Sequence, residues 1–479
     1  MKRLLLVVIL ASCWVSEGLS KGIEEDHIEF GPFGPLTVYS QSSQPSHVVL
    51  FVSGDGGWNL GVIEMARELT SLDAMVVGID IVRYLKHLES QSEGCSYPAA
   101  DFEMLSKFVQ KKLNYPRYVN PVLVGYSSGA TLIYAVLAQS PPNTFRGAIS
   151  MGFCPDLLLP KPLCRGSGLK WEKGPKNIGF IFSPATHLHE PWIALQGTID
   201  EVCYPKVTEE FVKRVNTGRL VLLPKVGHGF SVPRNWLLQF RDEFQRLVAQ
   251  SNRQPSSVMA DLQDLPLVEV PADAPSKDAM AVILSGDGGW AGIDREVAGV
   301  LAKRGIAVVG LNSLKYFWAK KTPEIAAEDL NRILRAYLTT WKKDRVILVG
   351  YSLGADVLPF MANRIDSDLL NRVVLIALLG PGNDANFEFH LTDWLGGKSQ
   401  NSLPVLPETE KLANKHLLCI YGEEEKESLC SRLSVNQARL VPFKGAHHFG
   451  GSYETIANLI VEEEERASGA TNPQRTIKN

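Results

Sequence analysis

Two serines in this chain stand in the same glycine-flanked pattern, Gly-x-Ser-x-Gly. Ser127 is the centre of GYSSG, and Ser352 is the centre of GYSLG. An apolar run ending in LVG precedes each pattern, and a stretch typical of a helix follows it. This strand–turn–helix arrangement places a serine hydroxyl at a helix N-terminus, where partial positive charge stabilises an oxyanion. We therefore expect two nucleophilic serines. The alternative for either copy is an inert serine in a glycine-rich turn.

A nucleophilic serine needs a histidine as base and a carboxylate that orients the histidine. For a serine in such a turn, the chain order is serine, acid, histidine. In the first copy, Asp200 follows Gly197 by three residues, at the end of an apolar run. His228 then lies in the glycine-flanked sequence KVGHGF. The predicted first triad is Ser127, Asp200 and His228.

The second copy offers an equivalent set. Glu425 follows Gly422 by three residues, and His447 in KGAHHF aligns with the first histidine through a shared H-x-F. The serine and the acid are 73 residues apart in both copies, and this spacing was not used to choose the serines. The predicted second triad is Ser352, Glu425 and His447. Three neighbours remain as alternatives, Glu423 and Glu424 for the acid and His448 for the base.

A second glycine-rich sequence, SGDGGW, follows an apolar run at 53–58 and again at 285–290. In this type of fold, a loop at this place gives one N–H to the oxyanion hole, and the residue after the serine gives another. Aspartates near the pocket would attract a cationic substrate group, although aspartates also cap turns and helices. The predicted oxyanion and substrate-binding residues are Gly54, Asp55, Ser128, Gly286, Asp287, Gly288, Leu353 and Asp356. The alternative is a tight turn packed under Trp58 or Trp290.

The chain repeats itself in three blocks that keep their order. HVVLFVSGDGGW recurs as AMAVILSGDGGW, AMVVGIDIVRYL as IAVVGLNSLKYF, and PVLVGYSSGATL as VILVGYSLGADV. In both copies, short β-branched runs alternate with longer stretches of helical period, which indicates a mostly parallel sheet with helices on both faces. The predicted fold class is α/β, as a tandem duplication of one α/β-hydrolase-like domain.

The ends of the copies set the predicted domain boundaries. Residues 1–20 combine a basic start, a short apolar run and small residues, which is typical of a signal peptide. The sequence LASC also resembles a lipoprotein box, so a lipid anchor at Cys13 is an alternative. We predict domains at 21–252 and 253–465, joined by a polar linker, and a flexible tail at 466–479.

Six cysteines remain after the first. An even number in an exported protein favours disulfides over a metal site. The sequence has no Cys-x-x-Cys or histidine-rich ligand spacing, so we predict no metal and no other cofactor. The simplest prediction pairs cysteines that are close in the sequence, although other connectivities stay open. The guessed pairs are Cys154–Cys164, Cys419–Cys430 and, by remainder, Cys95–Cys203.

The composition excludes several classes of protein. Among 479 residues, Lys and Arg total 49 and Asp and Glu total 52, and this near-neutral balance argues against a nucleic-acid binder. The 40 Gly and 28 Pro show no period, which excludes a collagen-like chain. After residue 20, no stretch is apolar enough to span a bilayer.

The motifs together resemble the VirJ family of bacterial virulence proteins. The resemblance lies in SGDGGW, GYSxGAD, GFCPD, YGEEE…SLC and GAHHF, and the double length resembles the AcvB branch. It implies an exported periplasmic protein linked to virulence and type IV secretion, and in that branch a hydrolase of aminoacyl-phosphatidylglycerol, especially lysyl-phosphatidylglycerol. By motif, the family nucleophile falls on Ser352, with His447 and Glu425. The first copy differs from these family motifs in GYSSGAT and HGF, so the question whether it turns over substrate stays open.

This chemistry suits the predicted triads. Acyl transfer from the lipid ester to serine, followed by attack of water, would release lysine and phosphatidylglycerol. The pocket aspartates would pair with the amines of the substrate, and Lys315 or Lys444 would meet the lipid phosphate. The expected partners are an aminoacyl phospholipid at the membrane surface and type IV secretion components, and no nucleic acid. Two other readings remain, a general envelope esterase, lipase or thioesterase, and a non-enzymatic adaptor for a secretion system.

Overall fold

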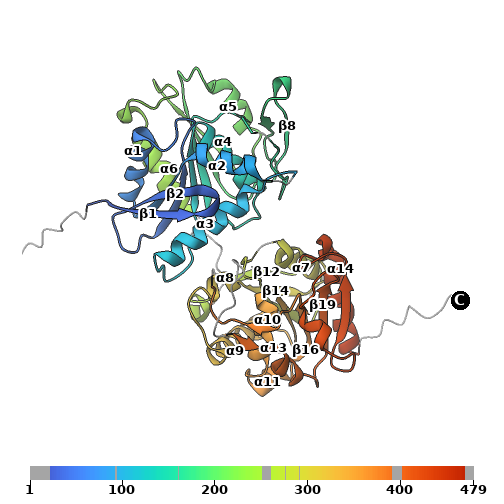
Figure 1. Ribbon diagram of the computed structural model, residues 1–479. Coiled ribbons are helices and arrows are strands. Elements are labelled where there is room, and N and C mark those ends of the chain that lie inside the picture. The colour runs from blue at the N-terminus through green and yellow to red at the C-terminus, as the bar shows by residue number, and fades with distance from the viewer. Residues whose placement is uncertain are drawn as a thin grey trace, which may run out of the picture.

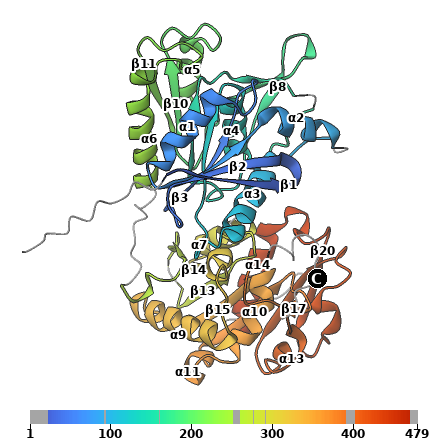
Figure 2. The same cartoon turned by 60° about the vertical axis from the view of Figure 1, so that its left-hand side comes forward.

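The computed structural model describes residues 22–91, 94–159, 161–250, 260–275, 277–290, 292–390 and 402–469. Each half of the chain forms one large, mostly parallel sheet with helices packed on both faces (Figures 1 and 2). The predicted signal peptide, the acylation site at Cys13, the boundary between the predicted domains and most of the predicted tail lie outside the described residues.

The first sheet has eight strands in the order β1-β2-β4-β3-β5-β6-β10-β11. Strands β1 and β2 form antiparallel pairs, and the pairs from β4 to β11 are parallel. The strands are β1 Glu24–Phe30, β2 Gly34–Ser40, β3 His47–Val52, β4 Ala74–Ile79, β5 Val122–Tyr126, β6 Gly147–Met151, β10 Trp192–Gly197 and β11 Gly218–Leu223. A small antiparallel sheet contains β7 Asp156–Leu157, β8 Trp171–Lys173 and β9 Phe180–Phe182.

Among the described residues of the first half, six α-helices accompany this sheet. They are α1 Leu60–Thr70, α2 Ile81–Ser90, α3 Pro98–Lys112, α4 Ser128–Gln139, α5 Pro205–Val212 and α6 Leu237–Gln250. Short 3-10 turns lie at η1 Gly31–Phe33, η2 Pro175–Asn177 and η3 Pro233–Asn235.

The second sheet repeats this order with seven strands, β12-β14-β13-β15-β16-β19-β20, and β12 is antiparallel to β14. Its strands are β12 Leu267–Val270, β13 Ala279–Leu284, β14 Ala307–Leu311, β15 Arg345–Tyr351, β16 Val373–Leu379, β19 Leu417–Gly422 and β20 Arg439–Phe443. Strands β17 Asp384–Ala385 and β18 Leu403–Pro404 form a separate pair.

The described helices of the second half continue the pattern. They are α7 Gly292–Lys303, α8 Ser313–Tyr316, α9 Pro323–Thr340, α10 Leu353–Ala362, α11 Ser367–Leu370, α13 Val405–Glu410 and α14 Tyr453–Ala467, with 3-10 turns η4 Ala260–Leu262, η5 Leu429–Arg432 and η6 Phe449–Gly451. Among the described helices, none has both the length and the hydropathy to cross a bilayer. Helix α14 ends two residues inside the segment predicted as the tail.

The apolar strands are explained by burial on both faces. In β3, Val48, Leu50 and Val52 pack into the core on one face of the sheet, while Val49 and Phe51 pack into the core on the other. Successive side chains of a strand point to opposite faces, so a strand covered on both sides must be apolar at every position. Strand β13 shows the same alternation between two core clusters.

The strand order brings the two glycine-rich motifs together. Strand β3 pairs with β4 on one side and with β5 on the other, so the crossover connections change direction there. Ligand sites in open parallel sheets lie at the carboxyl ends of the strands at such a point. The first SGDGGW loop follows β3 and the first Gly-x-Ser-x-Gly turn follows β5; β13 and β15 carry the second pair.

The two halves meet through aromatic side chains next to α3, which faces the second half in Figure 2. Tyr118 of the first half packs in one buried cluster with Leu314, Trp318 and Phe389 of the second. The Trp318 indole N–H donates a hydrogen bond of 2.8 Å to the carbonyl oxygen of Tyr115.

Three disulfides are formed, Cys95–Cys164, Cys154–Cys203 and Cys419–Cys430. The prediction of the last pair is confirmed, and the guesses Cys154–Cys164 and Cys95–Cys203 were wrong. The reason is topological. The segment around Cys164 runs beside Ser96, with Cys164 N–H bonded to the Ser96 carbonyl at 2.8 Å, whereas the loop after β6 carries Cys154 towards the loop after β10. Three disulfides are typical of proteins from an oxidising compartment.

Candidate active site

Both predicted nucleophiles lie in strained turns at the carboxyl ends of β5 and β15. Ser127 has φ 55° and ψ −124°, and Ser352 has φ 52° and ψ −120°. A Cβ at Gly125 would overlap the backbone of Gly129, and a Cβ at Gly129 would overlap the carbonyl of Ser53. The equivalent glycines of the second half are packed in the same way. These turns therefore need glycine on both sides of the serine, and the strain places each serine at a helix N-terminus.

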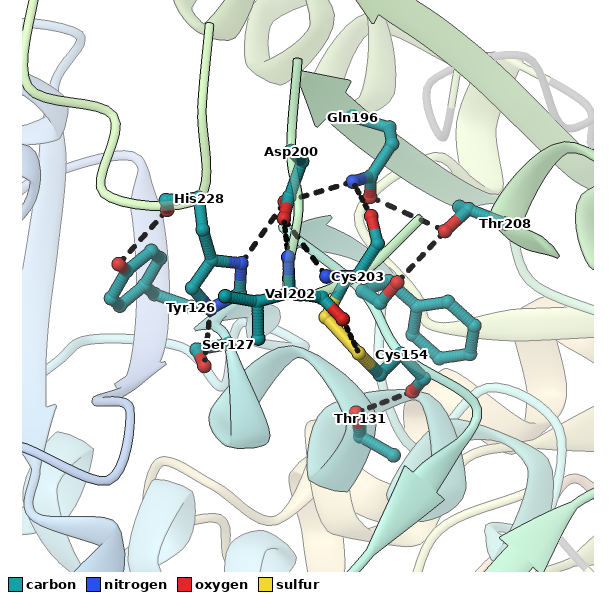
Figure 3. Close-up of a disulfide and its surroundings, with 11 residues drawn as sticks. Tyr126, Ser127, Thr131, Cys154, Gln196, Asp200, Val202, Cys203, Thr208 and His228 are labelled. Atoms are coloured by element: carbon teal, nitrogen blue, oxygen red, sulfur yellow. Dashed lines mark hydrogen bonds and ion pairs between the residues drawn. A yellow bond between two sulfur atoms is a disulfide. The ribbon is translucent and has the colours of Figure 1, made fainter. Parts of the chain in front are cut away.

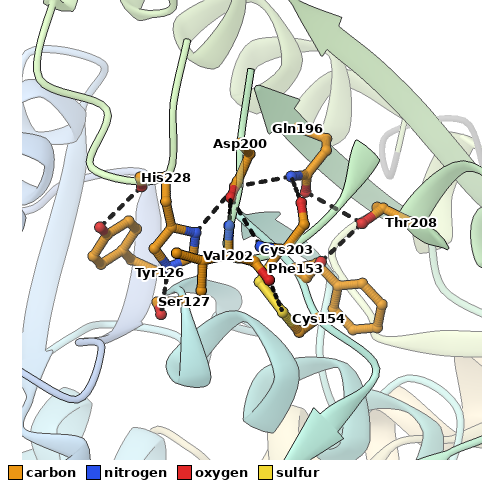
Figure 4. Close-up of polar contacts among 10 residues, drawn as sticks. All are labelled: Tyr126, Ser127, Phe153, Cys154, Gln196, Asp200, Val202, Cys203, Thr208 and His228. Atoms are coloured by element: carbon orange, nitrogen blue, oxygen red, sulfur yellow. Dashed lines mark hydrogen bonds and ion pairs between the residues drawn. A yellow bond between two sulfur atoms is a disulfide. The ribbon is translucent and has the colours of Figure 1, made fainter. Parts of the chain in front are cut away.

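In the first half, Ser127, His228 and Asp200 form a continuous chain of hydrogen bonds (Figure 4). The distance from Ser127 Oγ to His228 Nε2 is 2.9 Å, and the distance from His228 Nδ1 to Asp200 Oδ2 is 3.0 Å. His228 lies on the loop after β11, and Asp200 lies on the loop after β10. This arrangement allows the imidazole to accept the serine proton while the carboxylate holds the ring in place.

Asp200 is held by three donors besides the histidine. Its Oδ1 accepts the backbone N–H groups of Val202 at 2.9 Å and Cys203 at 2.8 Å, and its Oδ2 accepts Nε2 of Gln196 at 3.0 Å. The Asp200 side chain is fully buried. Because an unpaired buried carboxylate is costly, these donors fix its position and keep it available to His228.

A disulfide adjoins this triad (Figure 3). Cys203 bonds to Asp200 through its N–H, and its sulfur is joined to Cys154 on the loop after β6. The carbonyl of Cys154 accepts the hydroxyl of Thr131, one turn into α4, at 2.6 Å. The acid loop is therefore tied covalently to a segment that also contacts the helix after Ser127.

The second half shows the equivalent pair of histidine and acid. His447 Nδ1 lies 2.5 Å from Glu425 Oε1, and Glu425 Oε2 accepts the N–H of Gly422 at 2.7 Å. A Cβ at Gly380 would lie 2.9 Å from His447 Cε1, so this glycine makes room for the ring. Within the described part of the chain, Ser352 Oγ has no hydrogen bond to His447. The second triad thus has a hydrogen bond between acid and histidine only, whereas the first triad also has the hydrogen bond between histidine and serine.

The alternative residues of the second half have other contacts. His448 Nδ1 lies 3.1 Å from the hydroxyl of Tyr351, and burial, followed by the adjacent histidine, lowers the pKa of His448. Glu423 and Glu424 are exposed. Of the three neighbouring glutamates, Glu425 is the one whose carboxylate contacts the histidine.

The SGDGGW loops lie against the two serines. A Cβ at Gly54 would be 3.0 Å from the Cβ of the first serine, and a Cβ at Gly286 would be 3.4 Å from that of the second. Ser128 and Leu353 begin α4 and α10, and the N–H groups of a first helical turn have no partner within the helix. The arrangement suits the predicted oxyanion holes. Asp55 accepts the Ser128 hydroxyl at 2.6 Å and thereby links the loop to the helix.

Carboxylates gather near the second serine. Asp356, in the first turn of α10, accepts the N–H of Gly382 at 2.6 Å. Burial, and then the charges of Asp287 and Asp384, raise the pKa of Asp356 to about 8 against the opposing hydrogen bond from Gly382. Gly288, which follows Asp287, is exposed.

Across the described residues, His, Cys, Asp and Glu side chains form no group of three that could hold a metal ion.

A family model described as bacterial virulence protein (VirJ) matches residues 46–152 and 278–468. The two matches together cover more than half of the chain. The protein belongs to the VirJ family. The first match ends before the acid and histidine of its triad, whereas the second includes Ser352, Glu425 and His447. The resemblance expected from the motifs is thereby confirmed for both copies.

Solved structures similar to the VirJ-family chain include three hydrolases. The esterase domain of a Rhodothermus marinus protein is 16% identical with a TM-score of 0.32, and the match covers 48% of this chain and 98% of that one. A lidless α/β serine hydrolase of Xanthomonas campestris is 19% identical with a TM-score of 0.30, and the match covers 48% and 94%. A dienelactone hydrolase of Anabaena variabilis is 16% identical with a TM-score of 0.35, and the match covers 47% and 98%. No curated protein matches the chain.

Several residues that support the VirJ-family sites were not predicted from the sequence. Gln196 holds the first acid, and the signal was a polar residue inside the otherwise apolar strand WIALQG. The hydroxyl of Tyr126 donates to the carbonyl of His228 at 3.0 Å, and Tyr351 donates to the carbonyl of His447 at 3.4 Å. The shared tyrosine in GYS was the available signal for this repeated contact.

Proposed function

We propose that this VirJ-family protein is a serine hydrolase of the bacterial envelope that cleaves the aminoacyl ester of aminoacyl-phosphatidylglycerol. The observation that carries the hydrolase proposal is the unbroken chain of hydrogen bonds Ser127–His228–Asp200. An equivalent acid–histidine pair stands near Ser352. Duplication of the same arrangement in one chain favours a catalytic role over an inert glycine-rich turn.

The proposed reaction has two steps of acyl transfer. The serine Oγ attacks the ester carbonyl while the histidine takes its proton, and the oxyanion forms beside Gly54 and Ser128, or Gly286 and Leu353. The histidine then returns the proton to the departing hydroxyl of phosphatidylglycerol. Water, deprotonated by the same histidine, attacks the acyl-serine and releases the amino acid.

The surroundings of the two serines support different preferences. Near Ser352, the carboxylates of Asp287 and Asp384 favour the cationic amines of a lysyl group, and the protonated Asp356 adds no charge near neutral pH. Next to the first acid, Ile199 and Val202 are 62% and 63% exposed, and apolar side chains at a site mouth favour an acyl chain or another apolar ester. We therefore assign lysyl ester cleavage to the second half and neutral ester cleavage to the first.

Three disulfides support action outside the cytoplasm, and we place the protein in the periplasm. An aminoacyl phospholipid would then be reached at the membrane surface. The association with type IV secretion components stays a prediction from the family resemblance.

The test is hydrolysis of lysyl-phosphatidylglycerol in vesicles, measured as free lysine, beside hydrolysis of a neutral p-nitrophenyl ester. Ser352→Ala is expected to lower lysine release about 10³-fold, and Ser127→Ala is expected to lower neutral ester turnover by a similar factor. The double variant loses both activities, and the exposed Ser90→Ala serves as the control.

Absence of lysine release by the wild-type protein, or equal release by Ser352→Ala, contradicts the substrate assignment. Turnover of neutral esters by the double variant contradicts the hydrolase mechanism itself. A double variant that still supports secretion fully would favour the adaptor reading.

A further inference from the structure

An open cavity of about 1000 Å³ lies between the two halves. On the first half it is lined by residues at the amino ends of strands, such as His47 at the start of β3 and Arg146 just before β6. On the second half it is lined by Asn312 and Lys315, which follow β14, and by Arg295 of α7. The carboxyl edge of the second sheet therefore faces the amino edge of the first across this cavity.

Positive charge predominates in the lining. The cationic side chains are Arg117, Arg146, Arg295 and Lys315, and the carboxylates are Asp73 and Glu190. Two histidines, at positions 47 and 189, also line it. A cavity with walls of low polarisability concentrates the field of such charges and favours an anionic occupant.

The cations of the lining are not paired with carboxylates. Within the described residues, none of the four forms an ion pair. Arg146 reaches the carbonyl of Val248 through one terminal nitrogen, but its Nε is buried without a hydrogen-bond partner. Arg295 Nη1 is likewise buried without a partner. Lys315 is exposed. Buried charged groups in folded proteins are normally paired, so the buried nitrogens of the two arginines call for an anion.

The two carboxylates of the cavity are already bound by backbone donors. Asp73 Oδ2 accepts the N–H of Ser46 at 3.1 Å, and Glu190 Oε1 accepts the N–H of Asn143 at 2.5 Å. Burial raises the pKa of Glu190, which weakens it further as a counter-charge. The positive charge of the lining is thus only partly offset.

The pKa values of the three cations are lowered by their surroundings in the cavity. Burial lowers the pKa of Lys315, and the charge of Arg146 lowers it further. Burial also lowers the pKa of Arg146, and it lowers the pKa of Arg295 although the nearby charge of Glu190 acts in the opposite direction. Like charges from both halves are therefore held together in a partly dry space, and an anion between them would relieve the repulsion.

The cavity adjoins the second predicted oxyanion loop. Trp290, Asn312 and Lys315 line it and also line a smaller pocket that includes Gly288 and Gly289. A ligand held in the cavity would therefore lie beside the loop that follows β13. Because residues of both halves form the walls, the site exists only when the halves are docked.

We propose that Arg146, Arg295 and Lys315 bind a phosphoryl group in this cavity. Guanidinium groups match the oxygens of a phosphate in a forked geometry, and a lysine adds a point charge. The volume exceeds that of inorganic phosphate and leaves room for a larger group. The occupant is therefore either free phosphate or a phosphodiester headgroup with its polar substituent. This binding is separate from ester hydrolysis, because it uses neither triad.

The test is titration of the full-length protein with inorganic phosphate at low ionic strength, followed by calorimetry. Lys315→Gln is expected to raise the dissociation constant about tenfold, because it removes one of the three cations assigned to the phosphoryl group. Lys320→Gln removes the same charge from an exposed position nearby in the chain, outside the lining, and is expected to change the constant less than twofold. Thermal unfolding of both variants checks that they fold.

Glycerophosphoglycerol, titrated in the same way, distinguishes the two sources of the phosphoryl group. Tighter binding of this headgroup than of phosphate identifies a lipid headgroup, and tighter binding of phosphate identifies the free ion. Either result supports the site if Lys315→Gln weakens the binding of that probe. Failure of both probes to bind the wild-type protein, or equal affinity in folded Lys315→Gln, overturns the proposal whatever the outcome of the hydrolysis assays.

Discussion

A buried or half-buried carboxylate orients the histidine in each half, but the two carboxylates are supported differently. Asp200 accepts two backbone N–H groups and the amide of Gln196 in addition to the histidine. Glu425 accepts the N–H of Gly422. More donors hold a carboxylate more rigidly, and the better supported acid belongs to the triad that is formed throughout.

The first prediction concerns the role of Asp200. In Asp200→Asn, the amide keeps the size of the side chain but no longer stabilises a positively charged His228. Turnover of a neutral ester, measured in a Ser352→Ala background, is expected to fall about 10³- to 10⁴-fold. The exposed Asp156→Asn is the control and keeps full activity. A loss of less than tenfold in Asp200→Asn would show that the first triad does not operate.

The second prediction concerns Asp356, whose pKa is raised to about 8 by burial and then by neighbouring aspartates. An aspartate in an unfolded chain loses its proton near pH 4. Between about pH 4 and 8 the folded state therefore binds more protons, and this group makes the free energy of unfolding fall as the pH rises. Asp356→Asn removes the effect while an amide oxygen can still accept the N–H of Gly382.

Thermal unfolding at pH 5 and pH 8 measures this difference. Asp356→Asn is expected to gain stability relative to the wild type at pH 8 compared with pH 5. The exposed Asp384→Asn should show a smaller change in the same direction, because it removes one of the charges that act on Asp356. An unchanged difference at the two pH values would contradict the raised pKa.

At the scale of residues, the sequence predicted each triad because chain order and spacing restrict the choice. Asp200 and Glu425 were predicted from their place three residues after a strand-end glycine, with the equal separation from the serines as support, and the structure places each acid against its predicted histidine. The contrast between Ser127 and Ser352 could not be predicted, because a hydrogen bond depends on a ring position that no sequence pattern encodes. The buried state of Asp356 was hidden for the same reason.

At the scale of elements, loops at the carboxyl ends of strands carry the site, and a disulfide braces two of them. Cys154 follows β6 and Cys203 follows β10, in the loop of Asp200. The equivalent loops of the second half lack this bridge; its disulfide, Cys419–Cys430, joins β19 to η5. The first acid loop is consequently the more constrained of the two.

The third prediction separates this local effect from stability. Replacing both Cys154 and Cys203 by alanine opens a loop of 49 residues and is expected to cost about 4 kcal/mol of unfolding free energy. Neutral ester turnover below the melting temperature is also expected to fall, because the loop whose residue 203 N–H holds Asp200 loses its covalent tether. Assays at 15 °C with denaturant titrations in parallel measure both quantities.

The matched control is removal of Cys95–Cys164, which closes a loop of 69 residues away from the triad. It should cost a similar free energy and leave turnover at 15 °C unchanged. Equal turnover losses in the two double variants would show that the bridge at Cys203 has no specific effect on the site.

Elements were predicted more reliably than cysteine pairs. Strand β13 is apolar at every position and β3 at every position after His47, and both lie between polar or glycine-rich segments, so their places follow from the sequence. The pairing of cysteines depends on which loops the sheet order brings together, and proximity in the sequence is a poor guide to that. The pair Cys419–Cys430 was correct because its two segments are adjacent in the chain.

At the scale of the whole molecule, the contact between the halves forms both an aromatic cluster and the cavity described above. Trp318 of the second half is almost fully buried and binds the carbonyl of Tyr115. The ammonium of Lys111 donates to the Trp318 carbonyl at 2.6 Å and pairs with Glu388. The duplication alone predicted two similar domains, but it carried no information on how they dock.

The fourth prediction follows from this contact. Trp318→Ala removes a large buried side chain and is expected to cost about 3–5 kcal/mol of contact free energy. Amide hydrogen exchange in the segment 115–118 should then rise, and phosphate binding in the cavity should weaken. Trp171→Ala, in the small sheet of the first half, is the control and should leave both measurements unchanged. Unaltered exchange in Trp318→Ala would contradict this docking.

The central claim is that a serine in the strained turn is an activated nucleophile. Reaction with a fluorophosphonate probe, followed by mass spectrometry of the peptides, tests it most directly. We predict a covalent adduct on Ser127 in the wild-type protein, and its loss from that peptide in His228→Ala. An unmodified Ser127 in folded protein, or equal modification after His228 is removed, would contradict the account.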